Sequence, residues 1–560
     1  MRLGSLDYQF AFRTSNLTMD NMTSKKKELL ALVSFLILVP LLSHLLFSWM
    51  GFTPTDEGFT LAHSRRILDG QVPHRDFIII RPFFSPLLHV PEVLVGGDYI
   101  FWLSRMFVWF QLACMSWMWV SIGNRLTNAA LSLRSRFSLA LIAFAATTHT
   151  KHLTAWPTID GLFFVAIGLA LCVRKERITK LAGYFLLGIS PLCKQSFVFV
   201  VPLTLFILSD WTHLRYWLAA ALAPSCYLFY LILAHAVSDA ILQLTANTQL
   251  WSVGFQRYLD FRVVIPAIVG YLTCRLIYQQ RAANQRFTKA MAVSIVYYLP
   301  LLGTAVSLWF GILMNASFLL FGLLAGTVIY LLTDNSGLSI QKRFVLLALL
   351  TAWSASISLG YNSPALGSGT ILVALVVFVL STHKGDRTLE FSLVAAALVI
   401  ILSFGIARTR YIYRDQPAAN LNKSLEGVLP GGNLVYTNGN TYEFMSDLGK
   451  AIKLVEESQK AYAIIPDCAA YWVKATQENP LPAVWPITTE ELSKPVLVQR
   501  FIEAMEQKRS STIFIVQKVA ATTLANGFTP LPSNEYYEVV RYARAHFNKM
   551  AETSYFELYK

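Results

Sequence analysis

Two adjacent carboxylates, Asp56 and Glu57, directly follow the first long apolar run of the chain, residues 29–50. A carboxylate beside a low-dielectric region costs free energy unless it has a partner or a task. Neighbouring residues on a helix point about 100° apart, so we expect only one of the two to face a given cavity. A carboxylate held in this position is suited to general-base chemistry, in which it takes a proton from an incoming hydroxyl or amine.

Two cations interrupt apolar sequence downstream of these acids. Arg81 stands alone in IIIRPFFSPLL, and Lys194 follows Pro191 in the run 181–208. A lone Arg in such a place is either an interface residue whose side chain reaches water or a ligand for an anion. A guanidinium suits phosphate because its fork of donors binds two oxygens at once.

A third acid, Asp160, lies in the first turn of another apolar run, three residues after Pro157. This position is also typical of a plain helix start, where an acid favours the positive end of the helix dipole. The sequence therefore leaves two interpretations of Asp160 open, a helix-start acid and a functional group.

Four histidines stand near these acids and are the candidate metal ligands: His63, His74, His149 and His152. Their spacing alone does not define a metal site. The six cysteines are scattered without a CxxC pair or a Cys/His cluster, which argues against structural zinc and against a disulfide framework.

The composition indicates a membrane protein. Of 560 residues, 55% are hydrophobic and 14% charged, whereas a soluble domain carries about 25% charged residues. The net charge of +14 falls largely in short loops between apolar runs, as expected when basic loops stay on the cytoplasmic side. A nucleic-acid binder would instead gather its positive charge on one face, so we expect no nucleic-acid partner.

The apolar runs predict a polytopic α-helical protein with about thirteen transmembrane helices. Lys25, Lys26 and Lys27 precede the first run, which places the polar N-terminus, residues 1–28, in the cytoplasm. The membrane module then covers residues 29–407, and its first outer loop covers residues 51–100. We divide the run 181–208 into two short spans, because Pro191 and Lys194 would be costly in mid-bilayer.

An odd number of spans places residues 408–560 on the outer side of the membrane. Three segments of this tail, 433–438, 461–466 and 512–518, are typical of strands, and segments 441–458 and 496–509 have helical spacing between them. The sequence therefore predicts a C-terminal extracytoplasmic α/β domain. We expect it to be an acceptor-binding or structural cap.

The order of these features resembles a known family. The relevant stretches are Asp56-Glu57-Gly58 after the first span, DGQVPHRDF at 69–77, Arg81-Pro82, Asp160 at the start of a later span, and GISPLCKQS at 188–196. They resemble the polyprenyl-phosphate-sugar-dependent glycosyltransferases of the GT-C type. The layout is most similar to the bacterial aminoarabinose transferases that act on lipid A and to the protein O-mannosyltransferases. Arg81 stands where that family usually has Lys or His, and Lys151 and His152 stand where it often has Arg.

This resemblance implies an inverting transfer of a sugar from a polyprenyl-phosphate donor to a cell-envelope glycan, lipid or protein. Asp56 would be the base and Glu57 would orient a partner, while Asp160 would position a cationic group or the acceptor. Arg81 and Lys194 would hold the donor phosphate. A divalent metal ion is compatible with the superfamily. The implied location is the bacterial inner membrane, with the C-terminal domain in the periplasm.

Other classes stay open at this point. A transporter or flippase for a lipid-linked glycan would place ionisable groups in mid-bilayer and usually carry an inverted repeat, which this sequence lacks. An oligosaccharide ligase or polymerase normally has its main outer loop late among the spans. A scaffold that binds polyprenyl lipids would keep the cations without needing Asp56.

Overall fold

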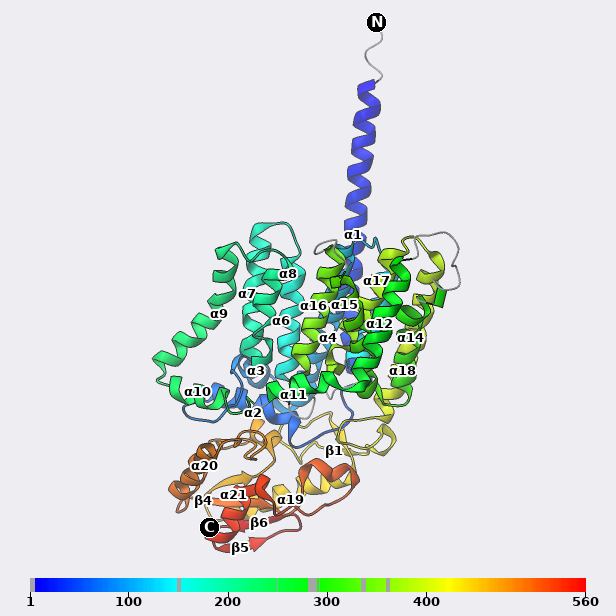
Figure 1. Ribbon diagram of the computed structural model, residues 1–560. Helices are drawn as coiled ribbons and strands as arrows, with labels where there is room; N and C mark the ends of the chain where they lie inside the picture. The colour runs from blue at the N-terminus through cyan, green and yellow to red at the C-terminus, as the bar shows by residue number, and fades with distance from the viewer. Residues whose placement is uncertain are drawn as a thin grey trace.

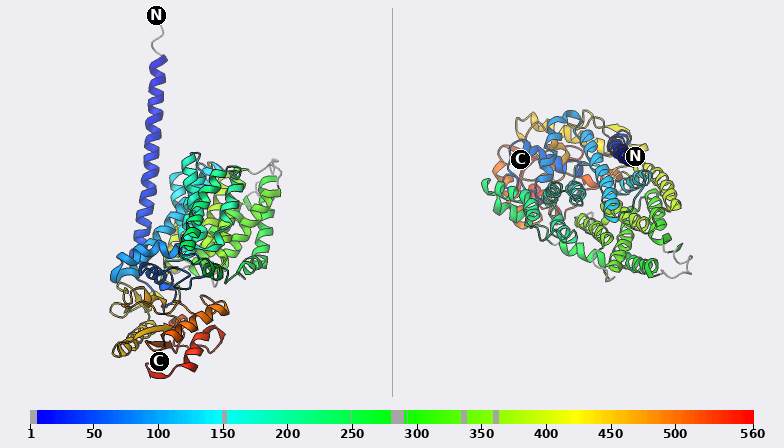
Figure 2. Two further views of the ribbon diagram at one scale, coloured as in Figure 1. Left: turned by 90° about the vertical axis from the view of Figure 1, so that its left-hand side faces the viewer. Right: turned by 90° about the horizontal axis from the view of Figure 1, so that it is seen from above.

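The computed structural model describes residues 6–148, 153–248, 250–279, 290–291, 293–333, 339–358 and 363–560. A bundle of roughly parallel helices makes up most of the chain, and a smaller domain with a sheet lies against one end of it (Figure 1). The first helix, α1, runs along the bundle and extends beyond the opposite end in both side views (Figures 1 and 2). The chain ends in the smaller domain.

The helices of the first half of the bundle are α1 (Leu6–Phe47), α2 (Asp56–Leu68), α3 (Phe84–Val95), α4 (Ile100–Thr127), α5 (Leu133–Thr148), α6 (Pro157–Cys172), α7 (Arg177–Cys193), α8 (Val200–Ile207) and α9 (Leu214–Leu233). The second half contains α10 (Val237–Leu244), α11 (Leu250–Gln256), α12 (Phe261–Gln279), α14 (Leu299–Trp309), α15 (Leu313–Thr333), α16 (Ile340–Ser356), α17 (Ser368–Thr382) and α18 (Arg387–Arg410).

The chain is a membrane-embedded protein. Six helices within the described residues are long and apolar enough to cross a bilayer, and several shorter apolar helices accompany them. The described parts of the predicted membrane module, residues 29–407, are mainly helical. The predicted interruption of the run 181–208 is also confirmed, because α7 ends at Cys193 and Lys194 has extended backbone.

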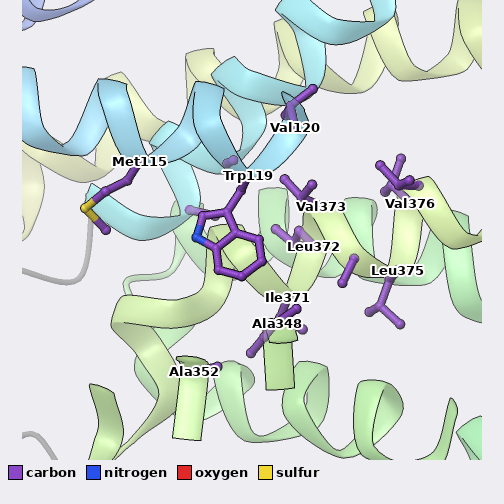
Figure 3. Close-up of a cluster of buried hydrophobic side chains, with 14 of the residues drawn as sticks. Met115, Trp119, Val120, Ala348, Ala352, Ile371, Leu372, Val373, Leu375 and Val376 are labelled. Carbon is purple, nitrogen blue, oxygen red and sulfur yellow. The ribbon is translucent and has the colours of Figure 1, made fainter. Parts of the chain in front are cut away.

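The centre of the bundle is closely packed and apolar. α4 packs against α5, α6, α16 and α17, and 94% of the apolar stretch that includes α17 is buried. Figure 3 shows Trp119 of α4 facing Ile371 and Leu372 of α17, with Ala348 of α16 beside them. The small alanine side chain lets these helices approach closely, as is common in membrane bundles. This packing fixes the helix ends from which the site residues project.

The C-terminal domain has a four-stranded sheet in the order β3-β4-β6-β5, in which β3 and β4 are parallel and the other pairs antiparallel. Its strands are β3 (Ala461–Ile465), β4 (Thr512–Gln517), β5 (Lys549–Glu552) and β6 (Phe556–Tyr559), and a separate small pair is formed by β1 (Lys423–Ser424) and β2 (Tyr436–Thr437). Its helices are α19 (Gly439–Glu456), α20 (Pro495–Lys508) and α21 (Glu538–His546). The predicted α/β character is confirmed, although β5, β6 and α21 were not expected.

Helix α2 lies between the bundle and the C-terminal domain. A Cβ atom at Gly58 would overlap the backbone of Ala470, so the two main chains touch at this point. The Ala470 amide donates to the Pro54 carbonyl at 2.9 Å. The Arg66 guanidinium, farther along α2, donates to the Asn479 carbonyl at 3.0 Å. The predicted outer loop 51–100 is therefore an ordered layer that carries α2 and α3.

Candidate active site

Asp56 occupies the first position of α2 and is only 3% exposed. The Tyr413 hydroxyl donates to its Oδ2 at 3.0 Å, and the Arg414 Nη1 lies 2.8 Å from the same oxygen, as an ion pair rather than an aligned hydrogen bond. Both partners belong to the segment that follows α18. The helix N-terminus also favours a negative charge at this position. The carboxylate of Asp56 is therefore held from two sides.

Glu57 points in another direction, as the helical geometry predicts. The Nε of Arg105, on α4, donates to Glu57 Oε1 at 2.8 Å in a buried ion pair. Burial raises the pKa of Glu57, and the neighbouring Arg105 opposes that rise. Arg105 also donates to the carbonyls of Ser48 and Gly51, each at 2.6 Å. The pair of Glu57 and Arg105 therefore holds the segment between α1 and α2 against α4.

Arg81 lies in the segment between α2 and α3, against two aromatic rings. Its guanidinium carbon is 5.3 Å from the ring centre of Phe59 and 5.5 Å from that of Trp156, within the range of a cation–π contact. Its Nη2 lies 3.8 Å from Glu490 Oε2, too far for a hydrogen bond. Its Nη1 is buried and has no hydrogen-bond partner within the described residues. The guanidinium therefore keeps donor capacity for a ligand.

Lys194 is buried at the end of α7, where burial and the nearby Arg81 lower its pKa well below its usual value, and its Nζ donates to two neutral oxygens. These are Thr158 Oγ1 at 3.1 Å and the Ala355 carbonyl at 3.4 Å. Lys194 and Arg81 line the same cavity, which has a volume of about 60 Å³ and also includes Ser196. That volume holds a few water molecules, which is the size range of one phosphate group. The structure brings together the two cations that the sequence assigned to phosphate.

The C-terminal domain adds two carboxyl groups to this region. Asp467 follows β3, is 4% exposed, and has an Oδ1 that is buried without a hydrogen-bond partner. Burial raises the pKa of Asp467 well above its usual value; the nearby Arg414 opposes the rise and Asp56 adds to it. Burial likewise raises the pKa of Glu490 to about 7, with Arg81 opposing and Asp56 adding to the rise. The charges of both carboxyl groups are therefore coupled to that of Asp56.

Three carboxyl groups and two guanidinium groups form one cluster at the boundary between the bundle and the C-terminal domain. We call it the boundary cluster, and its members are Asp56, Asp467, Glu490, Arg81 and Arg414. Sequence reasoning missed Arg414, Tyr413, Asp467 and Glu490. The sequence contains a signal for two of these residues. Arg414 comes shortly after the last apolar helix, and Asp467 follows the carboxyl end of a buried strand.

Asp160 belongs to a different polar group, in which it is fully buried. Its carboxylate accepts hydrogen bonds from Ser85 Oγ at 2.5 Å and from Gln111 Nε2 at 2.7 Å, and His89 Nε2 lies 3.2 Å from both of its oxygens. These contacts connect the start of α6 to α3 and α4. Within the described residues, Asp160 and Asp56 share no hydrogen-bond or ion-pair partner.

The two described histidine candidates do not fit a metal site. His63 uses one ring nitrogen on the Phe59 carbonyl at 2.8 Å and the other on Glu491 Oε1 at 2.9 Å. His74 lies between Gln243 and Tyr227, and burial lowers its pKa to about 4, so it is neutral. Among the residues that the structure describes, no three His, Cys, Asp or Glu side chains are grouped to hold a metal ion. His149 and His152 lie outside the described residues.

Comparison with known proteins gives one structural neighbour to report. No protein-family model matches the chain, and no curated protein matches it. Among solved structures, the chain is similar to ArnT from Cupriavidus metallidurans bound to undecaprenyl phosphate, with 12% sequence identity and a TM-score of 0.41. The alignment covers 94% of this chain and 97% of that one.

Proposed function

We propose that the chain is an inverting glycosyltransferase that moves a sugar from a polyprenyl-phosphate donor to an acceptor at the membrane surface. The observation that carries this proposal is the position of Arg81. One side of its guanidinium lines the cavity that also contains Lys194, and its Nη2 lies 3.8 Å from Glu490 in the boundary cluster. An anion-sized cavity with two cations thus adjoins a group of carboxylates, which is the arrangement that this reaction needs.

The role of each residue follows from the charge that develops on the reacting group that it contacts. The acceptor hydroxyl or amine attacks the anomeric carbon of the sugar while Asp56 takes its proton. The bond between that carbon and the phosphate oxygen breaks at the same time, and the electron pair leaves with the polyprenyl phosphate. Arg81 and Lys194 bind the phosphate oxygens as the negative charge grows there. The leaving phosphate is already an anion, so no general acid is required.

Asp56 is suited to act as the base because its position is fixed before substrate arrives. Tyr413 and Arg414 both bind Oδ2, and within the described residues Oδ1 accepts no hydrogen bond. Glu57 serves indirectly, since its ion pair with Arg105 holds the start of α2 against α4. Asp160 acts as a positioning residue that sets the first turn of α6, which carries the Thr158 hydroxyl next to Lys194.

The C-terminal domain takes part in substrate binding in this proposal. Asp467 and Glu490 each have a buried carboxyl oxygen without a hydrogen-bond partner in the described part of the chain. Sugar hydroxyls or an amino group would satisfy such oxygens. We place the protein in the bacterial inner membrane with this domain in the periplasm, where the acceptor is a cell-envelope glycan, lipid or protein.

Mass spectrometry of the cell envelope tests the function directly. A deletion strain is compared with the same strain carrying either the natural gene or an Asp56→Asn variant, and lipids, glycans and glycoproteins are profiled. We expect one sugar modification to disappear in the deletion strain, return with the natural gene and stay absent with the variant. A modification restored in full by the variant would contradict the proposed base.

A further inference from the structure

A cavity beside the first helix lies far from the boundary cluster. It has a volume of about 520 Å³ and is lined by residues of α1, α4, α5 and α6 and of the segments that follow α4 and α6. α4 starts beside the C-terminal domain, where the Asn433 amide donates to the Asp98 carbonyl at 2.9 Å. Its 28 residues extend about 42 Å from there, and the cavity is at the far end. The cavity therefore belongs to the opposite membrane face.

This cavity carries an excess of positive charge. Arg125, Arg136 and Arg174 line it together with one acid, Glu28, so the lining has a formal charge of +2 (three arginines minus one glutamate). Arg125 and Arg174 make no ion pair or hydrogen bond with protein groups in the described part of the chain. Two guanidinium groups are therefore available to a ligand that enters the cavity.

The third arginine is held in place at the cavity wall. Arg136 donates to Glu28 Oε1 at 3.0 Å, and its guanidinium carbon lies 5.8 Å from the ring centre of Trp117. Its Nε is buried and has no hydrogen-bond partner among the described residues. Arg136 thus offers a fixed donor that points away from bulk water, which a merely solvated loop arginine does not.

Apolar side chains complete the lining. Leu29 and Leu32 contribute from α1, a candidate membrane-spanning helix, and Leu29 is 61% exposed. Ala170 and Val173 contribute from the end of α6. A ligand that uses both parts of the lining needs a negatively charged head and an apolar body. Basic pockets between membrane helices commonly hold the headgroups of anionic lipids.

We propose that this cavity binds the phosphate of an anionic phospholipid in the leaflet opposite the C-terminal domain, with an acyl chain lying along α1. A free organic phosphate would share the headgroup chemistry but would gain nothing from Leu29 and Leu32. The site is independent of the proposed transfer reaction, because it uses none of the residues of the boundary cluster.

Native mass spectrometry of the delipidated full-length protein tests the proposal. The probes are phosphatidylglycerol, phosphatidylcholine with the same acyl chains, and glycerol 3-phosphate as the headgroup alone. We expect phosphatidylglycerol to bind preferentially and the Arg125→Ala/Arg174→Ala variant to weaken its binding about tenfold or more. Equal binding of phosphatidylcholine would overturn the proposal, and so would tighter binding of glycerol 3-phosphate, which would indicate a soluble phosphate ligand.

Two further variants separate a built site from general surface charge. Lys175→Ala/Arg177→Ala removes two positive charges from the adjoining segment without altering the cavity lining, and it should leave lipid binding unchanged. Asn128→Asp adds one negative charge inside the cavity at a left-handed position (φ 54°) that Asp tolerates, and it should weaken binding even if the double alanine variant does not fold. Equal losses in the lining variant and the Lys175/Arg177 variant would refute a specific site.

Discussion

The guanidinium of Arg414 lies 2.8 Å from the carboxylate of Asp56, so a residue four positions beyond the end of α18 is paired with the first residue of α2. The pair is largely buried, since the side chain of Asp56 is 4% exposed and that of Arg414 is 28% exposed. Such a pair fixes geometry more than it adds stability, because desolvation offsets most of the attraction. Its main effect is to hold the carboxylate of Asp56 in one orientation.

Replacing Asp56 by Asn should abolish sugar transfer. Asn keeps the shape and can still accept the Tyr413 hydrogen bond, but it cannot take a proton, and loss of a general base lowers the rate about 100-fold or more. The measurement is transfer rate with purified protein, together with its melting temperature. Asp98→Asn, which neutralises an exposed acid of the same predicted outer loop, serves as the control and should keep its activity. A fully active Asp56→Asn enzyme would remove Asp56 from the mechanism.

Changes at the two cavity cations should weaken binding of the donor lipid. Arg81→Ala and Lys194→Ala each remove a charge-assisted hydrogen bond worth about 1.5–3 kcal/mol, so undecaprenyl phosphate should bind about tenfold more weakly or worse to each variant. Arg81→Lys should recover part of the loss, because it restores the charge without the fork of donors. Arg75→Ala, at an exposed arginine of the same loop, should bind as the natural protein does. Unchanged binding in both cavity variants would mean that the phosphate lies elsewhere.

Glu490 should make stability depend on pH around neutrality. Its folded pKa is about 7, above the ordinary value of 4.5, so between these values the folded protein binds the proton more tightly than the unfolded chain does. The free energy of unfolding therefore falls as pH rises from 4.5 to 7, by about 3 kcal/mol at most, and stays lower above pH 7.

A neutral side chain at position 490 should remove this contribution. Melting temperatures of the natural protein and of Glu490→Gln are compared at pH 5 and pH 8, and the variant should gain stability relative to the natural protein at the higher pH. Glu426→Gln, at an exposed acid of the same domain, should follow the natural protein at both pH values. If the melting temperatures of the Glu490 variant and the natural protein differed by the same amount at pH 5 and at pH 8, Glu490 would not titrate in this range.

A methyl group at Gly58 should separate α2 from the C-terminal domain. The added Cβ would overlap the Ala470 backbone, which cannot move aside as a flexible side chain could. We expect Gly58→Ala to lower both the melting temperature and the transfer rate, because Asp56 lies two residues away on the same helix. Gly449→Ala is the matched control, since a Cβ there meets open space in the middle of α19. Equal melting temperatures for the two variants would contradict the close contact.

The sequence predicts the helices and the cations well, because both depend on local signals. The interruption at Lys194 follows from the cost of placing a cation and a proline in mid-bilayer, and the structure has its break there. The divergence of Asp56 and Glu57 follows from the rise and turn of a helix, and the two side chains do bind Arg414 and Arg105 respectively.

The rest of the site could not be predicted because it depends on tertiary packing. Tyr413 reaches Asp56 across 357 positions of sequence, and no local pattern fixes how the C-terminal domain docks on α2. The same packing gives His63 a carboxylate partner, Glu491, in place of the metal role that the sequence left open. Asp160 lies in the first turn of α6, as the helix-start interpretation expects, and it also bonds side chains of α3 and α4. Its interpretation as a functional group stays a prediction.

The covering of α2 by the C-terminal domain has a consequence for biosynthesis. His63 is made early in translation, whereas its partner Glu491 emerges 428 positions later. Until the last domain has emerged from the ribosome, Asp56, His63 and Arg66 of α2 lack their partners. Glu57 can already pair with Arg105 of α4. A nascent chain that has already inserted its helices is thus still inactive. Premature termination anywhere before the final sheet should therefore yield a membrane-bound but inactive product.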